Sequence, residues 1–134
     1  MNWKIIFQLS IFGLIMAFGT VFLIPEKISG IFWLPIFIFC AYVIARVCSS
    51  KFFLNGFMVS IVNCVWITGV HLLLYTRYVA LNSDMVQNLP HIFANHPRRD
   101  MLVVGPVIGV ISGLIIGFFA FIASKIVKPK QAAV

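Results

Sequence analysis

Hydrophobic residues fill four long stretches of the chain, and polar residues gather in the segments between them. Each stretch holds at least the ~17 residues that a helix needs to cross about 30 Å of hydrocarbon. The pattern therefore predicts an all-α integral membrane protein, in which residues 1–134 form a single domain and four transmembrane helices pack as an antiparallel bundle. The predicted spans are residues 5–24, 31–47, 53–78 and 101–127.

The connections between the spans differ in length. Short links follow the first and the second span, so consecutive helices are expected to lie as antiparallel neighbours. The third connection, residues 80–100, is much longer and is predicted to be the one long loop outside the membrane. Asn82 or Ser83 is expected to cap a short helix that runs to Leu89 and ends at Pro90. Loops of this length are often functional.

The third span carries a line of polar side chains along an otherwise apolar helix. At 100° per residue these side chains fall within an arc of roughly 120°, so one face of the helix is polar. One polar residue in a membrane helix is usually an interhelical hydrogen bond of ~0.6 kcal/mol, whereas a whole line of them indicates a cavity or a pore. We call them the polar stripe and predict that they line a ligand site: Ser60, Asn63, Thr68, His71 and Tyr75.

Glycine recurs at every fourth position of the fourth span. Glycine is less favourable than alanine inside a helix by roughly 0.8–1.0 kcal/mol, so a regular run of glycines indicates a packing role. Small residues at this spacing let a second helix approach closely. The partner is the third span or another copy of the chain. If the fourth span packs directly on the polar stripe, the stripe side chains only hold the two helices together and line no ligand site. We call these residues the glycine ladder: Gly105, Gly109, Gly113 and Gly117.

The composition fits a membrane location. Hydrophobic residues make up 62% of the chain and charged residues 10%, whereas a soluble domain is about 25% charged. The net charge of +7 is spread over tails and loops, and nearly all aromatic residues lie inside the spans. This distribution argues against nucleic-acid binding and indicates that the lipid bilayer, with its anionic headgroups, is the partner of the basic residues.

Lysine and arginine are divided unequally between the two sides of the predicted bundle. Six lie with the two termini, namely Lys4, Arg46, Lys51, Lys125, Lys128 and Lys130, against four on the other side, namely Lys27, Arg77, Arg98 and Arg99. The positive-inside rule then favours cytoplasmic N and C termini and an extracytoplasmic 80–100 loop. A bacterial cytoplasmic (inner) membrane is the expected location.

Few residues offer chemistry. No Asp, Glu, Lys or Arg is predicted deep within a span, which argues against proton-coupled pumps, voltage sensors and di-iron bundles. His71 has three interpretations: a structural hydrogen bonder, a cavity-lining residue, or a metal ligand or catalytic base. His91 and His96 are weak metal candidates because their spacing matches no zinc motif, and Arg98 with Arg99 is expected to anchor lipid headgroups. No cofactor and no catalytic residue are assigned.

Three functions stay open. The leading hypothesis is a small membrane protein that binds or conducts a small solute, an ion or a lipid-like ligand through the polar stripe as a homo-oligomer. The second hypothesis is a non-catalytic accessory or assembly subunit of a larger membrane complex, bound through the ladder and the loop. The third is a membrane enzyme that acts on lipid through its histidines, and we expect a binding role before an enzymatic one.

Overall fold

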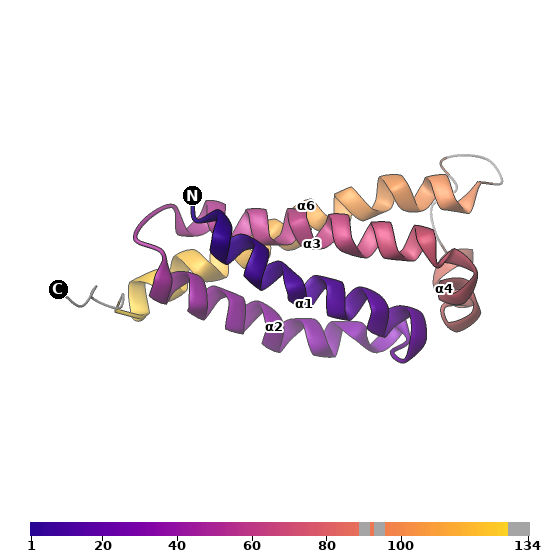
Figure 1. The fold of residues 1–134 in the computed structure, drawn as a ribbon, viewed down its shortest axis with the longest axis horizontal. Helices are drawn as coiled ribbons and strands as arrows, with labels where there is room; N and C mark the ends of the chain where they lie inside the picture. Colours follow the sequence, from indigo (N-terminus) through magenta and orange to yellow (C-terminus); the bar gives the residue numbers. More distant parts are fainter. Residues whose placement is uncertain (89–91, 93–95, 129–134) are drawn as a thin grey trace.

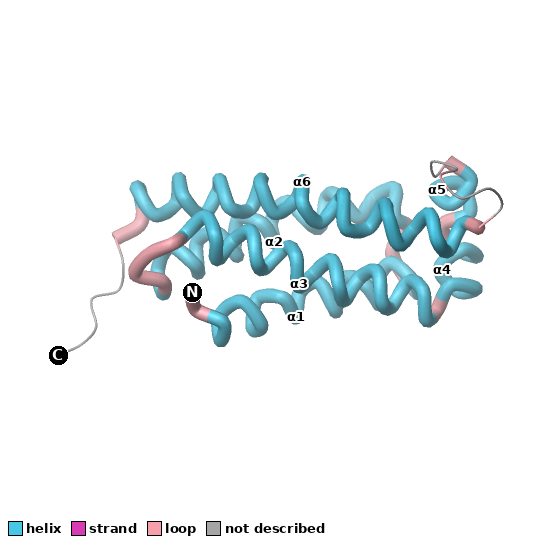
Figure 2. Tube along the Cα trace, turned by 90° about the horizontal axis from the view of Figure 1, so that it is seen from above, coloured by secondary structure: helices cyan, strands magenta, loops and turns pink. Residues whose placement is uncertain are grey.

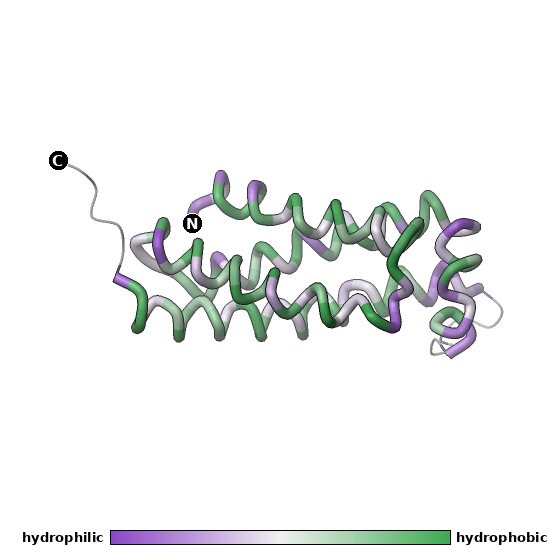
Figure 3. Tube along the Cα trace, turned by 90° about the horizontal axis from the view of Figure 1, so that it is seen from below, coloured by the Kyte–Doolittle hydropathy of each residue, from purple (hydrophilic) through white to green (hydrophobic). Residues whose placement is uncertain are grey.

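The computed structural model describes residues 1–88, 92 and 96–128, and the regular elements in these ranges are all helices. The long helices are α1 (Trp3–Phe22), α2 (Glu26–Val47), α3 (Phe52–Leu73) and α6 (Pro97–Ile126), and two short ones, α4 (Tyr75–Leu81) and α5 (Ser83–Gln87), lie at one end (Figures 1 and 2). Each long helix is long and apolar enough to cross a membrane. Most hydrophilic residues gather near the ends of these helices (Figure 3). The predicted all-α class with four candidate spans is confirmed.

Three helix boundaries differ from the predicted ones. α2 begins at Glu26 and not at residue 31, so Pro35 lies well inside the helix and not in its first turns. α3 ends at Leu73, and after Leu74 the chain continues in the separate helix α4, which interrupts the predicted span to residue 78. α6 begins at Pro97, because proline is favourable in the first turn of a helix, where its missing N–H needs no partner.

α3 is the helix on which the others assemble. It packs against α6 along its length and against α1 on another side, while α2 packs mainly against α6. α1 and α2, which a short link joins, have few close backbone contacts and meet through side chains such as the rings of Phe12 and Phe39, whose centroids lie 5.6 Å apart. On another side of α1, the bare backbone of Gly13 lets the side chain of Asn63 on α3 approach closely. The third and fourth spans, α3 and α6, are thus the most closely packed pair, and the first and second spans are packed less closely.

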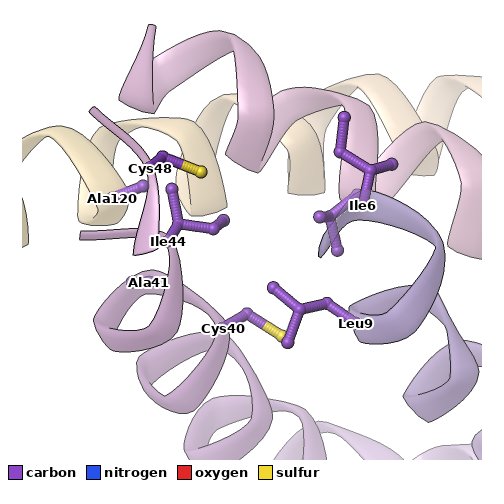
Figure 4. Packing of buried hydrophobic residues seen from close by; sticks show 8 residues of the cluster. Ile6, Leu9, Cys40, Ala41, Ile44, Cys48 and Ala120 are labelled. Carbon is purple, nitrogen blue, oxygen red and sulfur yellow. The ribbon is translucent and has the colours of Figure 1, made fainter. Parts of the chain in front are cut away.

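Two buried apolar clusters hold the helices together. The first takes residues from all four long helices, and seven of its members are labelled in Figure 4: Ile6, Leu9, Cys40, Ala41, Ile44, Cys48 and Ala120. The second lies toward the end that carries α4 and includes Ala17, Val21, Val70, Tyr78 and Met101. Val59 belongs to the first cluster and Val70 to the second. The polar stripe begins in the stretch of α3 between them.

A buried asparagine ties the link between α2 and α3. The side-chain oxygen of Asn55 accepts the backbone N–H of Asn2 at 3.0 Å. Its amide donates to the carbonyls of Ser50 and Lys51 at 3.2 and 3.0 Å. Because the ends of helices leave N–H and C=O groups without helical partners, this one side chain satisfies groups from both the N-terminus and the link.

A second buried asparagine, Asn82, satisfies backbone groups of helix ends at the opposite end of the bundle. The amide of Asn82 donates to the carbonyl of Thr20 at 2.9 Å and to that of Tyr78 at 3.2 Å, and its oxygen accepts the backbone N–H of Glu26. Asn82 is the N-cap residue of α5, as predicted, but its side chain makes no bond to that helix. It serves the last turn of α1 and the first turn of α2, whose end groups need partners. α5 ends at Gln87, and the predicted end at Leu89–Pro90 falls outside the described residues.

Candidate functional site

A cavity of about 480 Å³ lies between α2, α3 and α6, and residues of α4 and α5 line one end of it. Its size is within the ~300–1,000 Å³ of typical ligand pockets. Apolar side chains make up most of the wall, among them Trp33 and Phe37 from α2, Ile67 from α3, and Ile108 and Phe119 from α6. The polar residues of the wall are Ser60, Asn63, Thr68, His71, Tyr78 and Ser112.

The glycine ladder forms the contact between α6 and α3 beside this cavity. A Cβ added at Gly109 would lie 2.6 Å from the Cβ of Cys64, and one at Gly113 would lie 2.8 Å from the ring of Phe57. Such distances are shorter than any real carbon contact of ~3.5 Å. The other two members meet α3 as closely: Gly105 against Thr68 and Gly117 against Phe53. Of the two partners that the sequence left open, the ladder faces the third span of the same chain.

The polar stripe is divided between two surroundings. Ser60, Asn63, Thr68 and His71 all line the cavity, but Tyr75 does not. The helix break at Leu74 places Tyr75 at the start of α4, where its ring lies 4.7 Å from the guanidinium carbon of Arg98. The structure therefore brings four stripe residues together and sets Tyr75 apart from them.

Ser60 and Thr68 are occupied by packing contacts. The Ser60 hydroxyl donates to the carbonyl of Gly109 at 2.9 Å, a buried hydrogen bond between α3 and α6. The Thr68 hydroxyl lies 3.8 Å from the sulfur of Cys64 on its own helix. Ser60 therefore holds α3 and α6 together, as the packing interpretation of the stripe predicts.

His71 belongs to a buried polar cluster at the α4 end of the cavity. Its Nε2 lies 2.8 Å from the hydroxyl of Thr20, and its ring stacks on that of Tyr78 with centroids 4.1 Å apart. Tyr78 in turn donates to a carboxylate oxygen of Glu26 at 3.5 Å. Burial, together with the charge of Glu26, raises the pKa of the Tyr78 phenol, so this ring presents a neutral hydroxyl. Among the described residues, no hydrogen-bond partner faces the other ring nitrogen of His71.

Asn63 and Ser112 line the cavity and have no hydrogen-bond partner among the described residues. Asn63 is only 3% exposed, and its oxygen is buried against Gly13. Within the part of the chain that the structure describes, neither the Asn63 amide nor the Ser112 hydroxyl makes a hydrogen bond. Sequence reasoning missed Ser112, because a lone serine beside a ladder glycine carries no signal of which side of the ladder it lies on.

The predicted metal candidates lie in the loop before α6. His91 lies outside the described residues, and His96 is exposed at the N-cap of α6. Arg99 is exposed, and Arg98 is held over Tyr75. Over residues 1–88, 92 and 96–128, no group of three His, Cys, Asp or Glu side chains is placed to hold a metal ion.

The chain matches no protein-family model, no characterised protein and no solved structure. Its class therefore follows from its own helices, whose length and hydropathy indicate an integral membrane protein. Within that class, the particular feature of this chain is a largely apolar cavity that has a few polar side chains along its α3 and α6 walls.

Proposed function

We propose that this protein binds a lipid-like ligand in the cavity between α2, α3 and α6, and that it does so without catalysing a reaction. The observation that supports this most directly is Asn63, a buried amide that lines the cavity and has no partner among the described residues. Burial of an unpaired amide in apolar surroundings is unfavourable by roughly 2–7 kcal/mol. A ligand oxygen in the cavity would accept a hydrogen bond from the amide nitrogen of Asn63, while the amide oxygen stays buried against Gly13.

The walls favour binding over conduction. Ion pathways are lined by rings of carbonyls or charged side chains, whereas the wall here includes Trp33, Phe37 and Phe119. A ligand with a long apolar part fits such a wall, because burial of apolar surface contributes about 25 cal/mol per Å². His71, the histidine of the cavity wall, is engaged with Thr20 and Tyr78, which favours a structural role for it over an enzymatic one.

The proposal includes a membrane arrangement. The ladder contacts run in opposite sequence directions along α3 and α6, from Gly105 with Thr68 to Gly117 with Phe53, as in an antiparallel bundle. The distribution of lysine and arginine supports cytoplasmic termini in a bacterial inner membrane and an extracytoplasmic 80–100 loop. The ladder gives no support to a homo-oligomer, because α3 of the same chain covers it. One copy of the chain is sufficient for the proposed site.

Two glycines provide a matched test. A Cβ at Gly30 meets no atom within 4 Å, and Gly30 lines the cavity, so Gly30→Leu would project a side chain into it without a clash at the backbone. Gly69 on α3 is equally open but does not line the cavity. Both substitutions add the same apolar bulk, and both raise helix propensity.

The measurement is the lipid that stays bound to the purified protein. Wild type and Gly69→Leu should retain a bound amphiphile through mild detergent, detected by native mass spectrometry, while Gly30→Leu should lose it at unchanged helix content. Equal retention by all three proteins, or none by the wild type after reconstitution in its native lipids, would refute the proposal. Ion flux through liposomes that exceeds that of empty vesicles would instead support conduction.

A further inference from the structure

The cavity also restricts the chemistry of its occupant. We infer that the ligand is an uncharged amphiphile whose polar part carries a carbonyl or hydroxyl oxygen, and that this oxygen lies near the middle of the bundle between Asn63 and Ser112. The inference rests on the proposed function and names the class of ligand that the site would take.

The first argument is charge. None of the described residues that line the cavity is Asp, Glu, Lys or Arg. A phosphate or carboxylate in such a place would be a charge in apolar surroundings without a counter-ion, which is far less favourable than an uncharged group. A charged lipid headgroup is therefore excluded from the cavity, while a neutral group with one or two oxygens is accepted.

The second argument is the position of the unpaired polar groups. Ser112 lies between Gly109 and Gly113, which pack at Cys64 and Phe57, so it stands opposite the stretch of α3 between these two residues, about one turn from Asn63. An amide can donate two hydrogen bonds, and a serine hydroxyl can donate or accept one. Together they match a carbonyl or hydroxyl oxygen, and both lack partners among the described residues.

The third argument is the length of the cavity. Along α3 it extends from Ser60 to His71, which is about 16 Å at the rise of a helix. The polar side chains of the wall lie in two regions, one at Asn63 and Ser112 and one at His71 and Tyr78. Between these regions the wall includes Ile67 and Ile108. An elongated apolar chain or ring system fits this space, and a small polar solute would leave most of it without contacts.

Isoprenoid quinones and diacylglycerols both have this chemistry. The experiment adds four probes to the purified protein in micelles at the same mole fraction: menaquinone-4, dioleoylglycerol, phosphatidylglycerol and hexadecane. We expect menaquinone-4 or dioleoylglycerol to raise the Tm, and whichever gives the larger rise identifies the source of the ligand. Phosphatidylglycerol should have no more effect than hexadecane. An equal or larger rise with phosphatidylglycerol would overturn the inference.

Three variants distinguish a ligand-binding amide from packing glue. Asn63→Leu keeps the shape of the side chain, and it should raise the Tm of the ligand-free protein, because it removes an unpaired buried amide. It should also weaken binding of the neutral probes at least tenfold. Ser10→Ala, which removes the hydroxyl that accepts a hydrogen bond from the Trp66 indole away from the cavity, should lower the Tm and leave the probe affinity unchanged. Ser112→Ala should weaken binding with little change in Tm.

The experiments distinguish a failure of the inferred ligand chemistry from a failure of the proposed binding site. If Asn63→Leu and Ser112→Ala both bind the neutral probes like wild type, the inference about the polar part is wrong, while the cavity could still hold a lipid chain. If Gly30→Leu and Gly69→Leu retain the same amount of native ligand, the proposed site itself is wrong.

Discussion

Alanine in place of Gly109 tests the contact between α3 and α6 most sharply. The added Cβ would lie 2.6 Å from the Cβ of Cys64 and 2.8 Å from its sulfur, far inside the ~3.5–4.0 Å of an ordinary contact. The helices must then separate, and overpacking of this kind costs about 1–3 kcal/mol. Alanine also gains roughly 0.8–1.0 kcal/mol of helix propensity over glycine. The free energy of unfolding should therefore fall by up to about 2 kcal/mol.

Gly69→Ala is the control for this substitution. No atom lies within 4 Å of a Cβ at that position, so only the gain in helix propensity remains. The two variants should differ by about 1–3 kcal/mol in unfolding free energy, measured by far-UV circular dichroism during titration of dodecyl-maltoside micelles with SDS. Cys64→Gly removes the atoms that clash, so the double variant Gly109→Ala/Cys64→Gly should recover about 0.5–3 kcal/mol as a coupling energy. If Gly109→Ala is as stable as Gly69→Ala, α6 does not pack on α3 in this register.

Three other perturbations follow from the same contacts. Asn82→Ala should lower the unfolding free energy by about 1–3 kcal/mol, because the carbonyl of Thr20 and the N–H of Glu26 lose their partner; no change in the SDS titration would contradict the role of this side chain. Lys51 has a φ of 54°, so Lys51→Gly should raise stability by up to about 1 kcal/mol in the same assay. Since burial raises the pKa of Tyr78, its contribution to stability is complete below the unfolded pKa of about 10 and is lost as the pH rises above it. Tyr78→Phe should remove this part of the alkaline destabilisation, and identical pH profiles for the two proteins would refute it.

The spanning helices and the glycine ladder could be predicted from the sequence, because one physical constraint dominates each of them. Only runs of apolar residues can cross a bilayer, so the four spanning helices follow from hydropathy alone. A glycine at every fourth position has few uses other than close packing, and the ladder meets Cys64 and Phe57 as closely as its spacing requires.

The details of the site depend on tertiary geometry that no local pattern contains. Ser60 and Asn63 are three positions apart on one face, yet Ser60 bonds to α6 while Asn63 turns toward Gly13 and the cavity. The helix break at Leu74 is not marked by a glycine or a proline, so the sequence does not predict it. The break moves Tyr75 away from the stripe. Asn82 has the sequence signature of a helix cap, but buried end groups of two other helices compete for it successfully.

The two buried asparagines also bear on how the chain is made. Asn55 and Asn82 supply hydrogen bonds to the N-terminus and to the link between α1 and α2, and α2 finds its main packing partner only in α6. A ribosome adds about 5–20 residues per second, so the first two helices wait on the order of ten seconds for the last one. During that interval they lie in the bilayer with faces that α3 and α6 do not yet cover. We therefore expect the half-made protein to depend on membrane insertases, and a chain truncated after α2 to be removed by membrane proteases.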